Sequence, residues 1–293
     1  MKTLLIIAVL SNLAFAKVEV AVTYKYIEDI SKKIAGDLIE LKTLSKPKED
    51  PHFVMARPSL IAKLRNVDLL ILNGAQLEIG WLPPLIKRAN NQKVFEGAEG
   101  FLDLSHSIEM IDSHDSISRA DGDVHPDGNP HFILDPYNVL VVAKTIADKL
   151  SETDPKNREQ YQKNHQLFKA SWEKKLVIWN QKMKPLEGKK VIQYHKSFDY
   201  FLKRYKMTLL DTIEPIPGIS PTSKHTMSLI NQIRDEEESI LIMHDIYHNQ
   251  KAAKLIAAKT KAKIIDIPHD VDALDGADSI ENLFNTIVNG LTK

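Results

Sequence analysis

Short apolar runs alternate with amphipathic segments along most of the chain. Residues 18–23 form a β-branched run that predicts a strand, and residues 27–35 carry apolar positions at helical spacing. Residues 67–72 form an almost continuous apolar run, which is typical of a parallel strand covered on both faces. Strands that alternate with helices predict βαβ units and a parallel sheet.

The same alternation returns in the last third of the sequence. The further predicted strands are residues 38–44, 190–194, 207–213, 239–243 and 262–267. The further predicted helices are residues 59–65, 77–89, 138–150, 157–183, 198–205, 222–236, 251–259 and 279–291.

One helical pattern, residues 157–183, is much longer than the others and contains neither glycine nor proline. It is charged on one side and carries Trp172, Leu176 and Trp179 on the other. A helix of some 25 residues would span about 40 Å, which is long enough to link two domains rigidly. We therefore expect an α/β protein with two lobes, each with a mostly parallel sheet, joined by one long backbone helix. The expected divisions are an N-terminal lobe (17–136), a helical region with the linking helix (137–183) and a C-terminal lobe (184–293).

The first sixteen residues have the features of a secretory signal peptide. Lys2 precedes a short apolar stretch, and Ala14 and Ala16 form a small-x-small cleavage site. No cysteine follows this site, which argues against a direct membrane anchor there. No later apolar run reaches the roughly 20 residues needed to cross a bilayer. We expect a soluble protein exported to the periplasm.

Composition narrows the possible functions. The chain has 39 basic and 39 acidic residues, so its charge gives no reason to expect a nucleic acid or an anionic membrane as partner. Cysteine is absent, which excludes disulfides and thiolate ligands. Any bound metal must therefore be held by imidazole and carboxylate groups.

Three histidines stand at predicted strand-to-loop exits. They are His52 in Asp-Pro-His, His131 in Asn-Pro-His and His195 at the end of the run Val-Ile-Gln-Tyr-His. Neutral imidazole is the commonest metal ligand in proteins. Three imidazoles brought together from distant segments would suit a first-row transition metal, zinc above all.

Several motifs resemble the solute-binding proteins of bacterial zinc and manganese ABC transporters, a group called cluster A-I. The motifs follow one another in the family's order along the mature chain: Val22-Thr23, Gly36-Asp37, Asp50-Pro51-His52, Arg57-Pro58-Ser59, Asn73-Gly74, Leu77-Glu78, Trp81, Asn129-Pro130-His131, Leu134-Asp135-Pro136, Tyr194-His195, Phe198 and Gly218-Ile219-Ser220-Pro221-Thr222. Their order and spacing carry the resemblance, because no single motif is specific.

The resemblance implies a metal bound between two lobes that move little, and delivery of that metal to a membrane permease subunit. It places the first three ligands at His52, His131 and His195. An imidazole at the third position favours Zn²⁺ over Mn²⁺, although Mn²⁺ stays an alternative. The family's fourth ligand lies just after the last strand, where we expect His269, with Asp270 or Asp266 as alternatives. We expect a monomeric binding protein and not an enzyme.

Two alternatives compete with a zinc-uptake protein. Three histidines with an open fourth position are also the pattern of a zinc hydrolase, but neither HExxH nor Gly-x-Ser-x-Gly occurs here. The second alternative is a metal-buffering or adhesive protein that serves no transporter.

Four further histidines could also bind metal, and the sequence allows more than one interpretation of each. The acidic segment 105–130 contains His114 and His125, for which we favour a solvated loop over metal gathering. His244 and His248 have the i, i+4 spacing that binds metals on helices, but they follow a predicted strand and are weak candidates.

Overall fold

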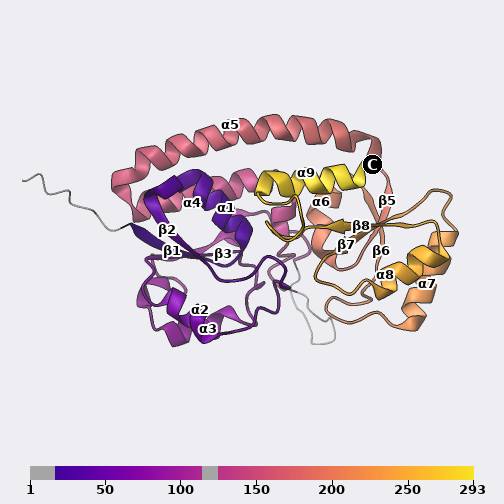
Figure 1. Cartoon of the computed structure of the whole chain (residues 1–293), viewed down its shortest axis with the longest axis horizontal. Coiled ribbons are helices and arrows are strands. Elements are labelled where there is room, and N and C mark those ends of the chain that lie inside the picture. The colour runs from indigo at the N-terminus through magenta and orange to yellow at the C-terminus, as the bar shows by residue number, and fades with distance from the viewer. Residues whose placement is uncertain (1–16, 114–124) are drawn as a thin grey trace, which may run out of the picture.

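The computed structural model describes residues 17–113 and 125–293; the predicted signal peptide and His114 lie outside these ranges. Two lobes lie side by side beneath one long helix (Figure 1). Each lobe contains a four-stranded parallel sheet, in the orders β2-β1-β3-β4 and β6-β5-β7-β8. The strands are β1 Val18–Val22, β2 Ile39–Thr43, β3 Leu69–Leu72, β4 Phe101–Asp103, β5 Lys190–Gln193, β6 Thr208–Thr212, β7 Leu241–Asp245 and β8 Lys263–Ile267. The predicted fold class is confirmed.

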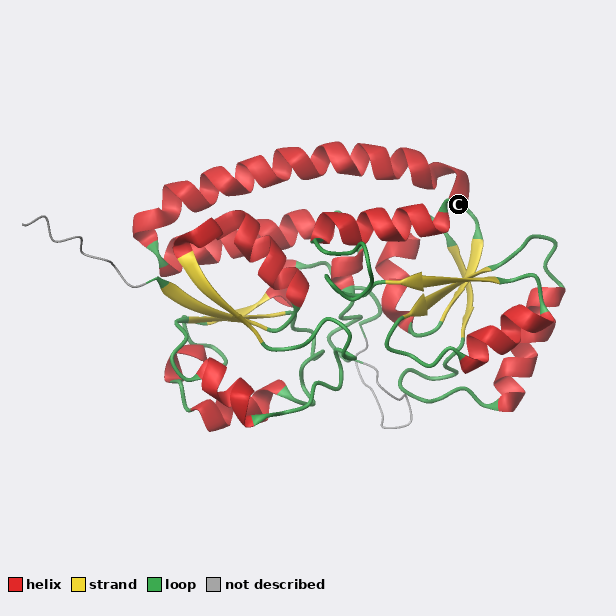
Figure 2. Ribbon diagram, in the orientation of Figure 1, coloured by secondary structure: helices red, strands yellow, loops and turns green. Residues whose placement is uncertain are grey.

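Helices cover both faces of each sheet (Figure 2). Burial on both faces explains why β3 and β7 are buried along their whole length. The helices beside the first sheet are α1 Lys25–Ala35, α2 Pro58–Leu64, α3 Leu82–Ala89 and, from the helical region, α4 Asn138–Thr153. Those of the second are α6 Asp199–Arg204, α7 Ser223–Arg234, α8 Lys251–Lys259 and α9 Ile280–Leu291.

The linking helix α5 (Arg158–Met183) runs over both lobes, as predicted (Figure 1). In the first lobe, Asn164 donates a 2.8 Å hydrogen bond to the carbonyl of Ile34 in α1. On the other side, the ring of Trp172 lies edge-on to that of Phe284 in α9, with 5.7 Å between centroids. Trp179 donates from Nε1 to Asn285, also in α9. Helix α5 therefore contacts helices of both halves of the molecule.

The C-terminal segment returns to the first lobe before the chain ends. Asp270 accepts hydrogen bonds from the backbone N–H groups of Lys25 and Tyr26 at the start of α1. Ile280, the first residue of α9, donates its N–H to Asp29 of α1 at 2.9 Å. These contacts give the two lobes a second, non-covalent connection.

Two local predictions differ from the structure. The helix predicted over 77–89 begins only at Leu82, with Pro83 and Pro84 in its first turn, where proline's missing N–H costs nothing. Ala75 and Gln76 have positive φ, so the chain turns there. Strand β4 was not predicted, because three residues are too few to establish an alternating pattern.

No helix in residues 17–113 and 125–293 is both long enough and apolar enough to cross a membrane.

Candidate metal centre

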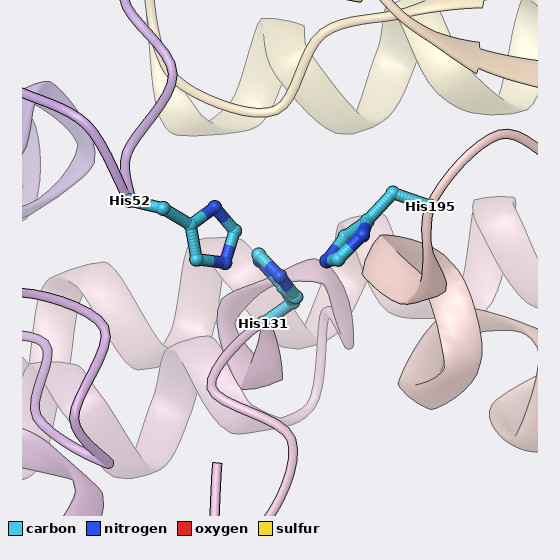
Figure 3. A group of neighbouring side chains, drawn as sticks. All are labelled: His52, His131 and His195. Carbon is cyan, nitrogen blue, oxygen red and sulfur yellow. The ribbon is translucent and has the colours of Figure 1, made fainter. Parts of the chain in front are cut away.

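His52, His131 and His195 converge between the lobes. One ring nitrogen from each lies within 4.8 Å of the others, and all three residues are buried. The ring centroids are 5.2 Å apart for His52 and His131 and 5.3 Å apart for each of the other two pairs. Figure 3 shows the three rings pointing toward a common space. Within the described residues, this is the one group of three or more potential ligands that is compact enough to hold a metal ion.

His52 lies in the loop between β2 and α2. The carbonyl of Pro51 accepts hydrogen bonds from Tyr24 Oη at 3.0 Å and from Trp81 Nε1 at 3.1 Å, which fixes the backbone beside the imidazole. His52 Nδ1 is 2.9 Å from Asp50 Oδ1, while its Nε2 is buried and has no hydrogen-bond partner. An ionised carboxylate only accepts, so Nδ1 carries the proton and Nε2 keeps a lone pair for a metal.

His131 is positioned by a buried network beneath the site. Asn73 donates from its side chain to the carbonyl of Pro130 at 3.0 Å. Glu78 in turn accepts from the backbone N–H groups of Asn73, at 2.8 Å, and Gly74, at 3.1 Å. Burial raises the pKa of Glu78 to about 7. The Asn-Gly and Leu-Glu motifs of the sequence therefore hold the segment that carries His131.

His195 comes from the second lobe, directly after β5. Its Nδ1 is 2.8 Å from Glu214 Oε2, and the same oxygen accepts from the N–H of Gly218 at 3.1 Å. Glu214 thus orients His195 as Asp50 orients His52. The side chain of Asn129 donates to the carbonyl of Lys196 at 2.8 Å, which ties the His131 segment to the second lobe.

Burial sets the charge of the centre. Burial, and then the neighbouring His52 and His195, hold the pKa of His131 well below its ordinary value. Burial raises the pKa of Asp50, but hydrogen bonds from His52 outweigh it and leave that pKa below its ordinary value. The free protein thus presents a neutral His131 imidazole and an ionised Asp50, which is the protonation state that metal binding requires.

The three residues considered for a fourth ligand lie outside this compact group. His269 Nε2 is 3.2 Å from the carbonyl of Glu49, and the ring lies edge-on to Tyr247. Asp270 is buried and accepts from three backbone N–H groups, two of them in α1. Asp266 is exposed and accepts from Gln250.

Other histidines lie near the centre. His125 is 9% exposed, and its ring stacks on that of His52 at 5.5 Å, so the expectation of a solvated side chain is wrong for this residue. His244 lies within β7 and His248 in the following turn, so their spacing is not helical. His248 stacks on Tyr194 at 4.2 Å, and its Nε2 is 3.6 Å from Glu214.

Replacing Glu214 with glutamine is expected to lower the affinity of the centre for a metal ion by about 10- to 100-fold, because the amide keeps the shape but loses the charge that orients and polarises His195. The matched control is Glu238→Gln, a surface carboxylate paired with Lys189. Competition titration against a chromophoric metal chelator measures both. Equal affinities for the two variants would show that Glu214 does not act through His195.

Acidification is expected to destabilise the metal-free protein less when His125 is replaced by glutamine. Burial, and then nearby His52 and His195, lower the pKa of His125 to about 3, whereas an unfolded histidine has a pKa of about 6.5. The contribution of His125 to the free energy of unfolding is fully present above about pH 6.5 and is lost as the pH falls toward 3, because only the unfolded chain takes up the proton. Between about pH 7.5 and about pH 5, the free energy of unfolding of the wild type should therefore fall by about 2 kcal/mol more than that of the variant. Urea unfolding in chelator measures it, and parallel losses in both proteins would contradict this burial.

Comparison with known proteins agrees with this fold and with a metal-binding protein. The model of the family described as ZnuA, zinc-uptake complex component A periplasmic, matches residues 20–291. The metal ABC transporter substrate-binding lipoprotein SloC of Streptococcus mutans is 29% identical over 232 residues, covering 78% of this chain and 72% of SloC. The iron ABC transporter substrate-binding lipoprotein MtsA of Streptococcus pyogenes is 32% identical over 194 residues, covering 64% of this chain and 59% of MtsA.

Solved structures share the two-lobed arrangement. A crystal structure of ZnuA aligns with a TM-score of 0.76 at 25% identity, covering 94% of this chain and 99% of that one. The manganese-bound periplasmic metal-binding protein of Candidatus Liberibacter asiaticus aligns with a TM-score of 0.77 at 21% identity, covering 94% and 98%. This second likeness shows the fold alone.

Fold and site together define a metal-binding protein of the solute-binding class that serves ABC transporters. The chain belongs to the ZnuA family of periplasmic zinc-uptake components. Members of this family are binding proteins, so the hydrolase considered from the three histidines is excluded.

Proposed function

We propose that the chain captures Zn²⁺ in the periplasm with His52, His131 and His195 and delivers it to the permease of an ABC transporter. One observation carries the proposal: the compact buried group contains three imidazoles and no carboxylate. Imidazole ligands suit zinc, whereas manganese prefers carboxylate, carbonyl and water oxygens. The hydrogen-bonded carboxylates of Asp50 and Glu214 support it, because they orient two imidazoles with a nitrogen free.

Manganese is the second candidate cargo, and a specific observation favours it. The substrate-binding lipoprotein PsaA of Streptococcus pneumoniae, named for manganese, is 29% identical over 230 residues, covering 74% of this chain and 69% of PsaA. This relative supports a transporter of the same class. Which metal this chain carries depends on its own ligands.

We further propose that residues 1–16 export the chain and that the mature protein works as a soluble monomer. The relatives named here are lipoproteins, whereas this sequence contains no cysteine. The proposed divisions remain a first lobe to residue 136, a helical region to 183 and a second lobe beyond it.

Uptake of radioactive zinc by cells tests the function. A strain that lacks this chain is expected to accumulate zinc slowly in zinc-poor medium, and the wild-type chain should restore uptake while His195→Ala should not. Restoration of manganese uptake instead would assign the chain to manganese. Normal uptake of both metals in the deletion strain would contradict a transport role.

A further inference from the structure

A fourth imidazole, that of His125, lies against the three-histidine group. Its ring stacks on His52 with 5.5 Å between centroids and 22° between planes. The residue is 9% exposed, and its Nε2 is buried without a hydrogen-bond partner. A buried polar nitrogen without a partner is costly, so its position calls for a ligand or a bound water.

The local sequence fixes His125 in this position. Residues 125–128 read His-Pro-Asp-Gly, and the N–H of Gly128 donates to the carbonyl of His125 at 3.1 Å, which closes a turn with proline at its second position. Gly128 has φ of +112°, and a Cβ there would lie 2.8 Å from the carbonyl oxygen of Ile111. Glycine is therefore required, and the turn joins His125 directly to the segment that carries His131.

That segment is held by three hydrogen bonds at Asn129. The N–H of Asn129 donates to the carbonyl of Ile111 at 2.8 Å, and its side chain donates to Lys196 beside His195. Tyr200 donates from its hydroxyl to the carbonyl of Asn129 at 2.9 Å. Hydrogen bonds therefore connect the turn of His125 to the segments that carry two of the three proposed ligands, His131 and His195.

A tetrahedral zinc ion held by three imidazoles has one position left. Asp270 directs its oxygens to backbone N–H groups, and Asp266 lies on the surface. His269 has its Nε2 near the carbonyl of Glu49, its Nδ1 buried without a hydrogen-bond partner and its ring edge-on to Tyr247. His125 also has a buried nitrogen without a partner, but its ring lies on the face of His52, one of the three proposed ligands.

We propose that His125 supplies the fourth ligand, so that the metal is enclosed by four imidazoles. The inference rests on the three-histidine site proposed above. The nitrogen of His125 is not among those within 4.8 Å of one another, so closure requires its ring to leave the stack with His52. Four nitrogen donors without a carboxylate would favour zinc over manganese more strongly than three, because each replaced oxygen removes a donor that manganese prefers.

The experiment compares zinc affinity in three single variants of the chain that begins at Lys17. His125→Gln is expected to weaken zinc binding by about 100-fold, since a ligand is lost from a high-affinity site. His269→Gln tests the rival ligand, and His106→Gln is the matched control, because the side chain of His106 is 83% exposed. Both of these variants should bind zinc as the wild type does. Wild-type affinity in a His125→Gln variant that melts normally without metal would overturn the proposal.

A second measurement needs no substitution. Nitrogen-15 NMR of the histidine side chains should show four ring nitrogens that shift when one equivalent of zinc is added to the wild-type chain. Three shifted nitrogens together with tight binding would overturn the role of His125 and leave the three-histidine site standing. Absence of tight zinc binding by the wild type would instead overturn the proposed function, which keeps the two failures distinct.

Discussion

Replacing His195 with alanine is expected to weaken zinc binding by roughly 150- to 700-fold. Structural zinc sites bind with about 10–16 kcal/mol, so one of three or four ligands accounts for about 3–4 kcal/mol, and each 1.4 kcal/mol is tenfold in affinity. His195 is the proposed ligand from the second lobe, hydrogen-bonded to Glu214 and within reach of His52 and His131. Its loss leaves zinc attached to the first lobe alone.

Competition titration against a chelator gives this affinity, with His106→Ala as the control for an exposed histidine. Because alanine leaves the buried Glu214 carboxylate without its partner, His195→Gln serves as a second variant that keeps volume and a donor. Unchanged zinc affinity in both variants would remove His195 from the site.

Zinc is expected to raise the melting temperature of the wild-type protein by roughly 10 °C. A ligand at 1,000 times its dissociation constant stabilises the native state by about 4 kcal/mol, and each kcal/mol shifts the midpoint by about 2–4 °C in a chain of this size class. The site joins segments from both lobes, so bound metal opposes their separation as well as their unfolding.

Scanning calorimetry with and without zinc measures the shift, and chelator should reverse it. His195→Ala provides the internal comparison, since its shift at the same zinc concentration should be much smaller. A wild-type midpoint that does not move at saturating zinc would contradict binding to the native state.

The fold, and the meeting of three candidate ligands, could be predicted because both leave local marks in the sequence. Burial on two faces makes β3 almost wholly apolar, and the 26 residues of α5 contain no helix breaker. His195 stands where a predicted strand gives way to a loop, which is where ligands gather in α/β proteins, and His52 lies in the loop that follows predicted strand 38–44. The structure brings both together with His131.

The surroundings of His125 and Asp270 could not be predicted, because non-local contacts decide them. The carboxylate of Asp270 bonds to the start of α1, a segment 245 residues away in sequence. His125 lies in a polar, acidic stretch that predicts solvent exposure, yet it is buried against His52. The only local signal was the Pro-Asp-Gly turn between His125 and the His131 segment, and a turn does not reveal what packs against it.

Calorimetric titration of the metal-stripped chain from Lys17, with zinc and manganese in separate runs, tests the central claim most directly. The account predicts one tight zinc site and weak manganese binding, because the compact buried group offers imidazole nitrogens and no carboxylate oxygen. Tight binding of manganese, or no tight site for zinc, would contradict it.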